Sequence, residues 1–151
     1  MARERGIPFE AVELDRLGAE SDVIVTITSS FHPILKASQV KAGTHLACMG
    51  SDTKGKQEVE AKLVSAATVF ADEVAQSVTI GEAQHAVAQG LLAEVAIIEI
   101  GAVINGTHPG RSSAEQITLF DGTGVGLQDL AVASAAVERA VEAGIAFDVD
   151  F

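Results

Sequence analysis

The chain has 151 residues, a formal net charge of −11 at pH 7 and 48% apolar residues. This length and apolar content predict a single domain over residues 1–151 with a core of its own. The acidic balance argues against binding to nucleic acid, which selects for basic patches. No apolar run approaches the ~18 residues that span a bilayer, and no apolar segment follows the N-terminal arginines, so we expect neither a membrane span nor a secretory signal.

The cysteine and histidine content predicts neither a disulfide nor a metal site. Cys48 is the only cysteine, which excludes an internal disulfide and fits a reducing, cytoplasmic compartment. No His or Asn is placed to activate its thiol, and a cysteine within a buried strand is usually an inert small hydrophobe. The four histidines lack the spacing of metal ligands. They are His32, His45, His85 and His108.

Four segments have the pattern of buried strands. Residues 21–28 (SDVIVTIT) form a β-branched run, typical of a strand that is buried on both faces. Shorter strands are predicted at 45–49, at 68–71 and at 117–120. Helical patterns separate the first three strands at a spacing of ~20–25 residues, which favours right-handed βαβ units and a parallel sheet.

Apolar residues at helical spacing predict three main helices, over 56–67, 81–89 and 127–143. Residues 93–103 are apolar enough for helix or strand, and we favour a helix that ends near Gly106. The last long helix is expected to bury one apolar face, formed by Leu130, Val137 and Val141. The two ends are predicted to be the tail of a surface helix (residues 1–5) and an edge strand or frayed segment (147–151).

The stretch Gly43–Glu58 (GTHLACMGSDTKGKQE) joins a run of small apolar residues to a polar loop. Open α/β sheets bind ligands outside the carboxyl ends of their strands. Asp52 in this loop could therefore act as a general acid or base, or bind a substrate ammonium group. Alternatively, Asp52 caps a short helix that begins near residues 54–57. Lys56 is either a phosphate or ribose contact or a solvated lysine.

Two further segments carry polar groups to predicted strand ends. Thr26 and Thr28 could direct hydroxyl groups at a nucleotide, or they could be ordinary β-branched strand residues. Residues 121–126 (DGTGVG) follow a strand and precede a helix, which mimics a dinucleotide-binding loop. However, Leu127 stands where a G-x-G-x-x-G motif requires glycine, so the match to that motif is imperfect.

Residues 50–58 resemble the signature of the ornithine cyclodeaminase/mu-crystallin family, a small-residue strand followed by Gly-x-Asp-x-x-Gly-Lys-x-Glu. The stretch ITLFDGTGVGLQDLA also resembles a later family signature, Thr-Leu-Phe-x-Ser-x-Gly-x-Ala-x-x-Asp. The resemblance implies an α/β fold, a partial Rossmann-like parallel sheet with flanking helices. It covers the later half of the family's proteins, so we expect a truncated product, a fragment or one piece of a split protein. Exposed apolar surface would then favour a homo-oligomer, most simply a dimer.

The resemblance also assigns roles to individual residues. Asp52 matches the catalytic aspartate of the family. Gly122 stands where the family often has serine, and Thr123 stands where a small apolar residue is frequent, which implies a more polar substrate pocket. Arg111, in HPGRSS, is expected to hold its loop through hydrogen bonds to backbone or carboxylate groups. The residues matched to the nicotinamide cofactor are Thr28, Leu46, Ala47, Cys48, Met49, Lys56 and Gly122.

The function implied by the resemblance is that of an NAD- or NADP-dependent enzyme acting on small amino or imino acids. The family's reactions include cyclodeamination of ornithine to proline and reduction of small imino acids by hydride transfer. The polar loop at Asp52 and the hydroxyl of Thr123 favour reduction of a small imine. The alternative is a non-catalytic, mu-crystallin-like nucleotide-binding or structural protein.

Overall fold

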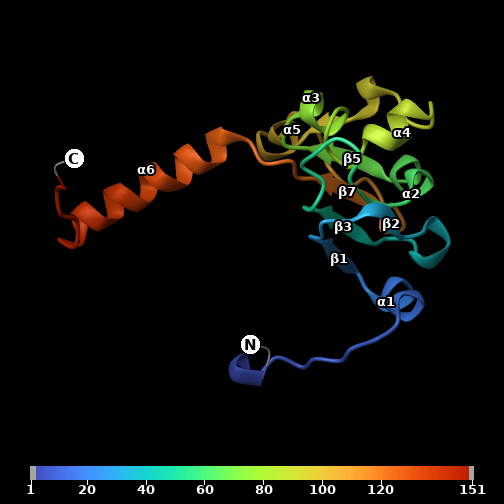
Figure 1. Ribbon diagram of the computed structural model, residues 1–151, viewed down its shortest axis with the longest axis horizontal. Helices are drawn as coiled ribbons and strands as arrows, with labels where there is room; N and C mark the ends of the chain where they lie inside the picture. The colour runs from blue at the N-terminus through green and yellow to red at the C-terminus, as the bar shows by residue number, and fades with distance from the viewer. Residues whose placement is uncertain (1–2, 150–151) are drawn as a thin grey trace.

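The computed structural model describes residues 3–149 and has an α/β fold built on one five-stranded sheet. The strand order is β1-β3-β7-β5-β6, and every pairing is parallel (Figure 1). The predicted α/β class and parallel sheet are therefore confirmed. The strands are β1 (Val23–Thr26), β3 (His45–Cys48), β5 (Thr68–Ala71), β6 (Ile98–Glu99) and β7 (Thr118–Asp121).

The core lies between one face of this sheet and the helices that connect its strands. Alternate strand residues such as Leu46, Val69 and Leu119 are buried there against Leu63, Val64 and Ala86. Leu63 and Val64 come from α2 and Ala86 comes from α4. The helices are α1 (Leu14–Glu20), α2 (Ala61–Ala66), α3 (Val74–Ser77), α4 (Gln84–Ala88), α5 (Ile100–Ile104) and α6 (Gly126–Glu142), with short 3-10 turns η1 (Arg3–Arg5), η2 (Ala37–Gln39) and η3 (Glu94–Ala96).

A second, two-stranded parallel sheet pairs β2 (Phe31–Leu35) with β4 (Gln57–Val59). The helix predicted over residues 56–67 is therefore wrong in its first part, and only α2 is helical. Leu35 pairs with Val59, and the N–H of Glu60 donates to Leu35 O at 2.9 Å. These tertiary partners outweigh the helical spacing of the apolar residues.

The other face of the large sheet is covered only in part. Val23 and Val25 of β1 are exposed, so the expectation that this strand is buried on both faces is wrong. The strand is an edge of the sheet, and no described element covers this side of it. On β5, next to the opposite edge strand β6, Phe70 is buried and its ring lies 5.9 Å from that of His108, in the segment between α5 and β7.

Residues 93–103 contain three short elements and not the single helix that their apolar run predicts. They are η3, β6 and α5. Ile98 and Glu99 pair with Phe70 and Ala71 of β5, so the sheet takes two residues from the middle of the segment. The helix prediction is correct only for α5, because the apolar run alone does not reveal the strand partner.

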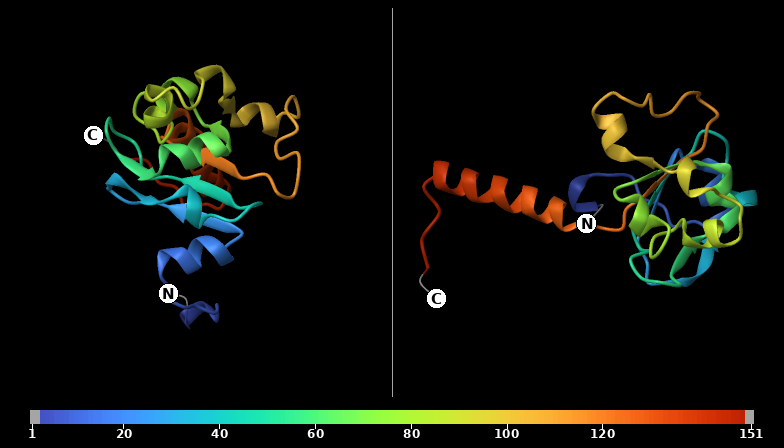
Figure 2. Two further views of the ribbon diagram at one scale, coloured as in Figure 1. Left: turned by 90° about the vertical axis from the view of Figure 1, so that its right-hand side faces the viewer. Right: turned by 90° about the horizontal axis from the view of Figure 1, so that it is seen from above.

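The helix α6 stands out from the sheet and its covering helices (Figures 1 and 2). Its bounds, Gly126–Glu142, agree closely with the predicted range. The expected burial of its apolar face is wrong, because Leu130, Val137 and Val141 are 61%, 62% and 63% exposed. No residue of α6 is buried, since nothing else among residues 3–149 packs over it.

The chain ends add little regular structure. Arg3–Arg5 form a single 3-10 turn, and residues 145–149 have no helix or strand. The remaining parts of the two predicted end segments, residues 1–2 and 150–151, lie outside the described residues. No helix within 3–149 combines the length and the apolarity needed to cross a membrane.

The packing of the core predicts which side chains can be shortened to alanine without a large loss of stability. Leu119→Ala is expected to lower the free energy of unfolding by about 2–5 kcal/mol, because Leu119 is completely buried in β7. Leu91→Ala is the matched control, since Leu91 is 43% exposed, and it should change the free energy by about 0.5 kcal/mol or less. Urea unfolding followed by circular dichroism would measure both. Equal effects would contradict the assignment of the core.

Candidate functional site

Three neighbouring strands of the large sheet end at the same level. Thr26, Cys48 and Asp121 are paired across β1, β3 and β7. The N–H of Met49 donates to Thr26 O at 2.8 Å, and the N–H of Gly122 donates to Cys48 O at 2.9 Å. The fold therefore brings the segments after Thr26, Cys48 and Asp121 to one edge, the place where parallel sheets bind ligands.

Asp52 and Lys56 form an ion pair in the loop between β3 and β4. Lys56 Nζ lies 2.7 Å from Asp52 Oδ1 and donates to Gly50 O at 3.2 Å. The side chain of Asp52 is 58% exposed and that of Lys56 is 16% exposed. The neighbouring Lys56 is the main cause that lowers the pKa of Asp52. Asp52 is therefore a carboxylate at neutral pH, suited to bind a cation.

The alternative roles considered for these two residues are not supported. Residues 53–55 form a turn, and β4 begins at Gln57, so Asp52 does not cap a helix. Lys56 is not a freely solvated lysine, because its ammonium group bonds to Asp52 and to a backbone carbonyl.

The two threonines at the end of β1 differ in their surroundings. The hydroxyl of Thr26 donates to Oε2 of the buried Glu58 at 2.7 Å, so it bonds within the protein and not to a ligand. Thr28 is exposed, and its hydroxyl accepts a bond of 3.3 Å from the N–H of Ser30. Only Thr28 therefore presents a side chain at the open edge, consistent with its predicted role.

The predicted cofactor residues on β3 lie at different depths. Met49, 41% exposed, reaches the edge, whereas Leu46 lies in mid-strand and packs in the core. The structure gives no support for a cofactor contact by Leu46. Ala47 is half-buried on the other face. Cys48 is buried, which raises the pKa of its thiol well above the usual value, as expected for an unreactive cysteine.

Gly122 lies against Met49 at this edge. A Cβ atom at position 122 would be 2.6 Å from Met49 Sδ and 2.8 Å from its Cε. The serine that the family often has here would therefore require the Met49 side chain to move. Gly122 leaves the ends of β3 and β7 in close contact.

Thr123 is held by groups of the protein itself. Its hydroxyl lies 2.9 Å from both Asp72 Oδ1 and Gln76 Oε1, and the N–H groups of Thr123 and Gly124 donate to Asp72 at 3.1 and 2.8 Å. Asp72, directly after β5, thus fixes the loop after β7. The hydroxyl of Thr123 thus bonds to groups that hold this loop, and its contact with a substrate stays a prediction.

Three buried carboxylates beneath the edge were not predicted to matter. Glu58, Glu82 and Asp121 are 0% exposed. Asp121 accepts bonds from the hydroxyl of Ser77 at 2.5 Å and from the N–H groups of Glu82 and Ala83 at 3.0 and 3.1 Å. Burial raises the pKa of Asp121, and it raises that of Glu82 to about 7. For Asp121 the sequence does carry a signal, an acidic residue at the end of the apolar run ITLFD.

The candidate site offers no metal centre. No group of three or more His, Cys, Asp or Glu side chains within residues 3–149 could hold a metal ion. No buried side-chain nitrogen or oxygen in this part of the chain lacks a hydrogen-bond partner.

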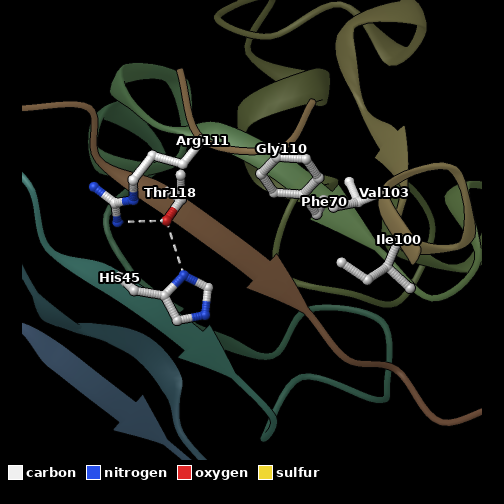
Figure 3. Close-up of a pocket in the computed structure, with 7 residues that line it drawn as sticks. All are labelled: His45, Phe70, Ile100, Val103, Gly110, Arg111 and Thr118. Atoms are coloured by element: carbon white, nitrogen blue, oxygen red, sulfur yellow. Dashed lines mark hydrogen bonds between the residues drawn. The ribbon is translucent and has the colours of Figure 1, made fainter. Parts of the chain in front are cut away.

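A separate pocket of about 260 Å³ opens at the other end of β3 and β7 (Figure 3). Arg111 donates to Gln116 O and, at 2.9 Å, to the hydroxyl of Thr118. The role predicted for Arg111, holding its loop through backbone, is confirmed. The hydroxyl of Thr118 also lies 2.8 Å from His45 Nδ1. None of the predicted site residues lines this pocket.

A parallel sheet with polar loops at the carboxyl ends of its central strands is the architecture of nucleotide-binding dehydrogenases. Solved structures agree with this class. The iminosuccinate reductase of Paracoccus denitrificans in complex with NAD⁺ matches with a TM-score of 0.94 and 63% identity, over 99% of this chain and 46% of that one. An archaeal alanine dehydrogenase dimer with bound NAD matches with a TM-score of 0.91 and 35% identity, over 99% of this chain and 47% of that one.

The sequence profile of the ornithine cyclodeaminase/mu-crystallin family matches residues 3–144. The chain therefore belongs to this family, and the resemblance found in the sequence is confirmed. Among curated proteins, the iminosuccinate reductase of Paracoccus denitrificans (strain Pd 1222) is 63% identical over 149 residues, which are 99% of this chain and 46% of the relative. The chain thus spans about half the length of this relative.

The buried carboxyl of Glu82 predicts a dependence of stability on pH. An acid whose pKa is raised from 4.5 to about 7 binds its proton more tightly in the folded state. The free energy of unfolding should therefore fall as the pH rises through this range, by about 3 kcal/mol at most. Glu82→Gln should remove this part of the decrease. Urea titrations at about pH 5 and about pH 8 would test it, and an identical decrease in both proteins would contradict it.

Proposed function

We propose that this chain forms part of an NAD(P)-dependent reductase of small imino acids. The observation that carries the proposal is the Asp52–Lys56 pair, at the carboxyl edge of a parallel sheet and beside the segments matched to the cofactor. The 63% identity to an iminosuccinate reductase supports reduction over cyclodeamination and favours a dicarboxylic imino acid as the substrate.

The residues at this edge fit the nicotinamide end of such a cofactor. Thr28 presents an exposed hydroxyl, Met49 presents backbone at the end of β3, and Gly122 adds no side chain above them. When bound, the reduced nicotinamide would supply a hydride to the imine carbon. The choice between NAD and NADP depends on groups near the ribose.

Asp52 would act on the nitrogen of the substrate. A protonated imine carries positive charge, and a carboxylate kept ionised by Lys56 attracts that charge and orients the nitrogen. As the carbon receives the hydride, the carbon–nitrogen double bond becomes single and the nitrogen keeps its proton. Lys56 keeps Asp52 ionised and fixes its loop through Gly50 O.

The first test is titration of NADH into the purified chain, followed by the fluorescence of the cofactor. The chain has no Trp or Tyr, so protein emission does not interfere. Saturable binding is expected, followed by NADH oxidation with a 2-oxo dicarboxylic acid and ammonium. Asp52→Ala should lower kcat by about 100-fold or more, because it removes the proposed contact with the nitrogen.

Two outcomes of this test separate the alternatives. Saturable binding with no turnover for any small 2-oxo acid would favour the non-catalytic nucleotide-binding protein of the family. Turnover that Asp52→Ala leaves unchanged would contradict the role of Asp52. A cytoplasmic location stays a prediction from the single cysteine.

We further propose that the chain forms a homodimer through α6. Leu127, Leu130, Val137 and Val141 recur at helical spacing along one side of this helix, and all four are exposed. The matched alanine dehydrogenase is itself a dimer.

The double variant Leu130→Glu/Val137→Glu is expected to convert the dimer to a monomer, because it places charges within the apolar stripe. Sedimentation velocity would measure the change. The control is Val132→Glu, since Val132 is exposed on the other side of α6 and should leave the dimer intact. A wild-type chain that is monomeric at high concentration would contradict the proposal.

A further inference from the structure

Glu58 lies between the two segments that carry the proposed site. Its side chain is completely buried. The carboxylate accepts a bond of 2.5 Å from the N–H of Thr28, on Oε1, and a bond of 2.9 Å from the N–H of Gly50, on Oε2. The hydroxyl of Thr26 also donates to Oε2, at 2.7 Å. One carboxylate thus joins the end of β1 to the end of β3.

Hydrogen bonds alone compensate the burial of the Glu58 carboxylate, because it has no cationic partner among residues 3–149. No lysine or arginine of this part of the chain forms an ion pair with Glu58. A buried carboxylate is costly unless it is hydrogen-bonded, and N–H groups that donate to a charged oxygen form strong bonds. Neither Thr28 N nor Gly50 N donates to a backbone carbonyl, so each depends on Glu58.

The packing at Gly50 shows how closely the two segments approach. A Cβ atom at position 50 would lie 2.4 Å from Thr28 O and 2.5 Å from Glu58 Oε1. Any side chain there would push the strand ends apart, because two of the nearest atoms belong to the backbone and to a held carboxylate. The separation of Thr28 from the loop that contains Asp52 is therefore fixed by Gly50 and Glu58 together.

We propose that Glu58 is the positioning residue of this site. Its carboxylate sets the distance between Thr28, the proposed cofactor contact, and the loop that carries Asp52, the proposed catalytic group. The roles given to Thr28 and Asp52 rest on the proposed function. The hydrogen bonds that Glu58 accepts are independent of it.

An amide cannot replace this carboxylate. The two N–H donors bind different oxygens, Thr28 N on Oε1 and Gly50 N on Oε2. A glutamine has one oxygen, so its NH₂ group must face one of these N–H groups. Glu58→Gln therefore leaves the N–H of either Thr28 or Gly50 without an acceptor.

Glu82 offers a matched control for the same chemical change. It is also completely buried, but both of its N–H donors, Val59 and Glu58, bond to the same oxygen, Oε1, at 2.7 and 2.9 Å. The N–H of Glu58 lies farther from Oε2, at 3.1 Å. Its Oε2 lies 2.5 Å from the hydroxyl of Ser51, and a hydroxyl can accept from an amide. Glu82→Gln thus keeps every N–H group paired.

The test compares the wild-type chain with Glu58→Gln and Glu82→Gln, below the melting temperature of each. Amide hydrogen exchange by ¹H–¹⁵N NMR should show Thr28 and Gly50 protected in the wild type and in Glu82→Gln. In Glu58→Gln one of the two amides should exchange about ten-fold faster or more. The Kd for NADH should rise about ten-fold or more in Glu58→Gln and stay within about two-fold in Glu82→Gln.

The outcomes that would overturn the role proposed for Glu58 are distinct from those that would overturn the proposed function. Equal protection of both amides in Glu58→Gln would overturn the proposal, and so would an equal rise in Kd in the two variants, which would mark a general effect of losing a buried charge. If Glu58→Gln does not fold, unprotected Thr28 and Gly50 amides in the wild type would overturn it. A wild type that binds no NADH would overturn the proposed function alone, because the exchange experiment still tests Glu58.

Discussion

Acidic side chains that accept backbone N–H groups hold the whole carboxyl edge of the sheet together. Glu58 joins the ends of β1 and β3, Asp72 holds the loop after β7, and Asp121 holds the segment before α4. Beyond the strands these backbone groups have no ladder partners, and buried donors must find acceptors elsewhere. The carboxylates supply these acceptors, so the shape of the candidate site depends on them more than on apolar packing.

This arrangement has an electrostatic consequence. The buried acids Glu58, Glu82 and Asp121 form no ion pairs within the described chain, and the protein as a whole carries a net charge of −11. Their ionised forms are tolerated only where enough donors converge. Burial raises the pKa of Glu82 to about 7 in spite of the donors around it. The interior beneath the edge is therefore sensitive to proton concentration, whereas Asp52, exposed and paired with Lys56, keeps its charge.

The sequence was sufficient to predict elements that depend on local pattern. The strands at 45–49, 68–71 and 117–120 and the bounds of α6 agree closely with the structure, because β-branched runs and turn residues act within a few positions. The errors all involve distant partners. Val59 pairs with Leu35 and not with its helical neighbours, Ile98 pairs with β5, and no residue of the described range 3–149 covers Leu130. A pattern shows that a residue is apolar but not which surface receives it.

The same division explains which parts of the site could be predicted. Asp52, Lys56 and Gly122 stand in signature motifs, and the structure brings all three to one edge. Glu58 ends the same signature as Asp52, yet nothing in its spacing shows that its two oxygens receive N–H groups from segments 30 and 8 residues away. An exposed reactive group is defined by its own chemistry, so a motif can reveal it. A supporting group is defined by the backbone atoms that reach it, and these are known only once the chain has folded. A buried acid is therefore best interpreted as an acceptor for unpaired backbone N–H groups, and its partners are the segments whose positions it controls.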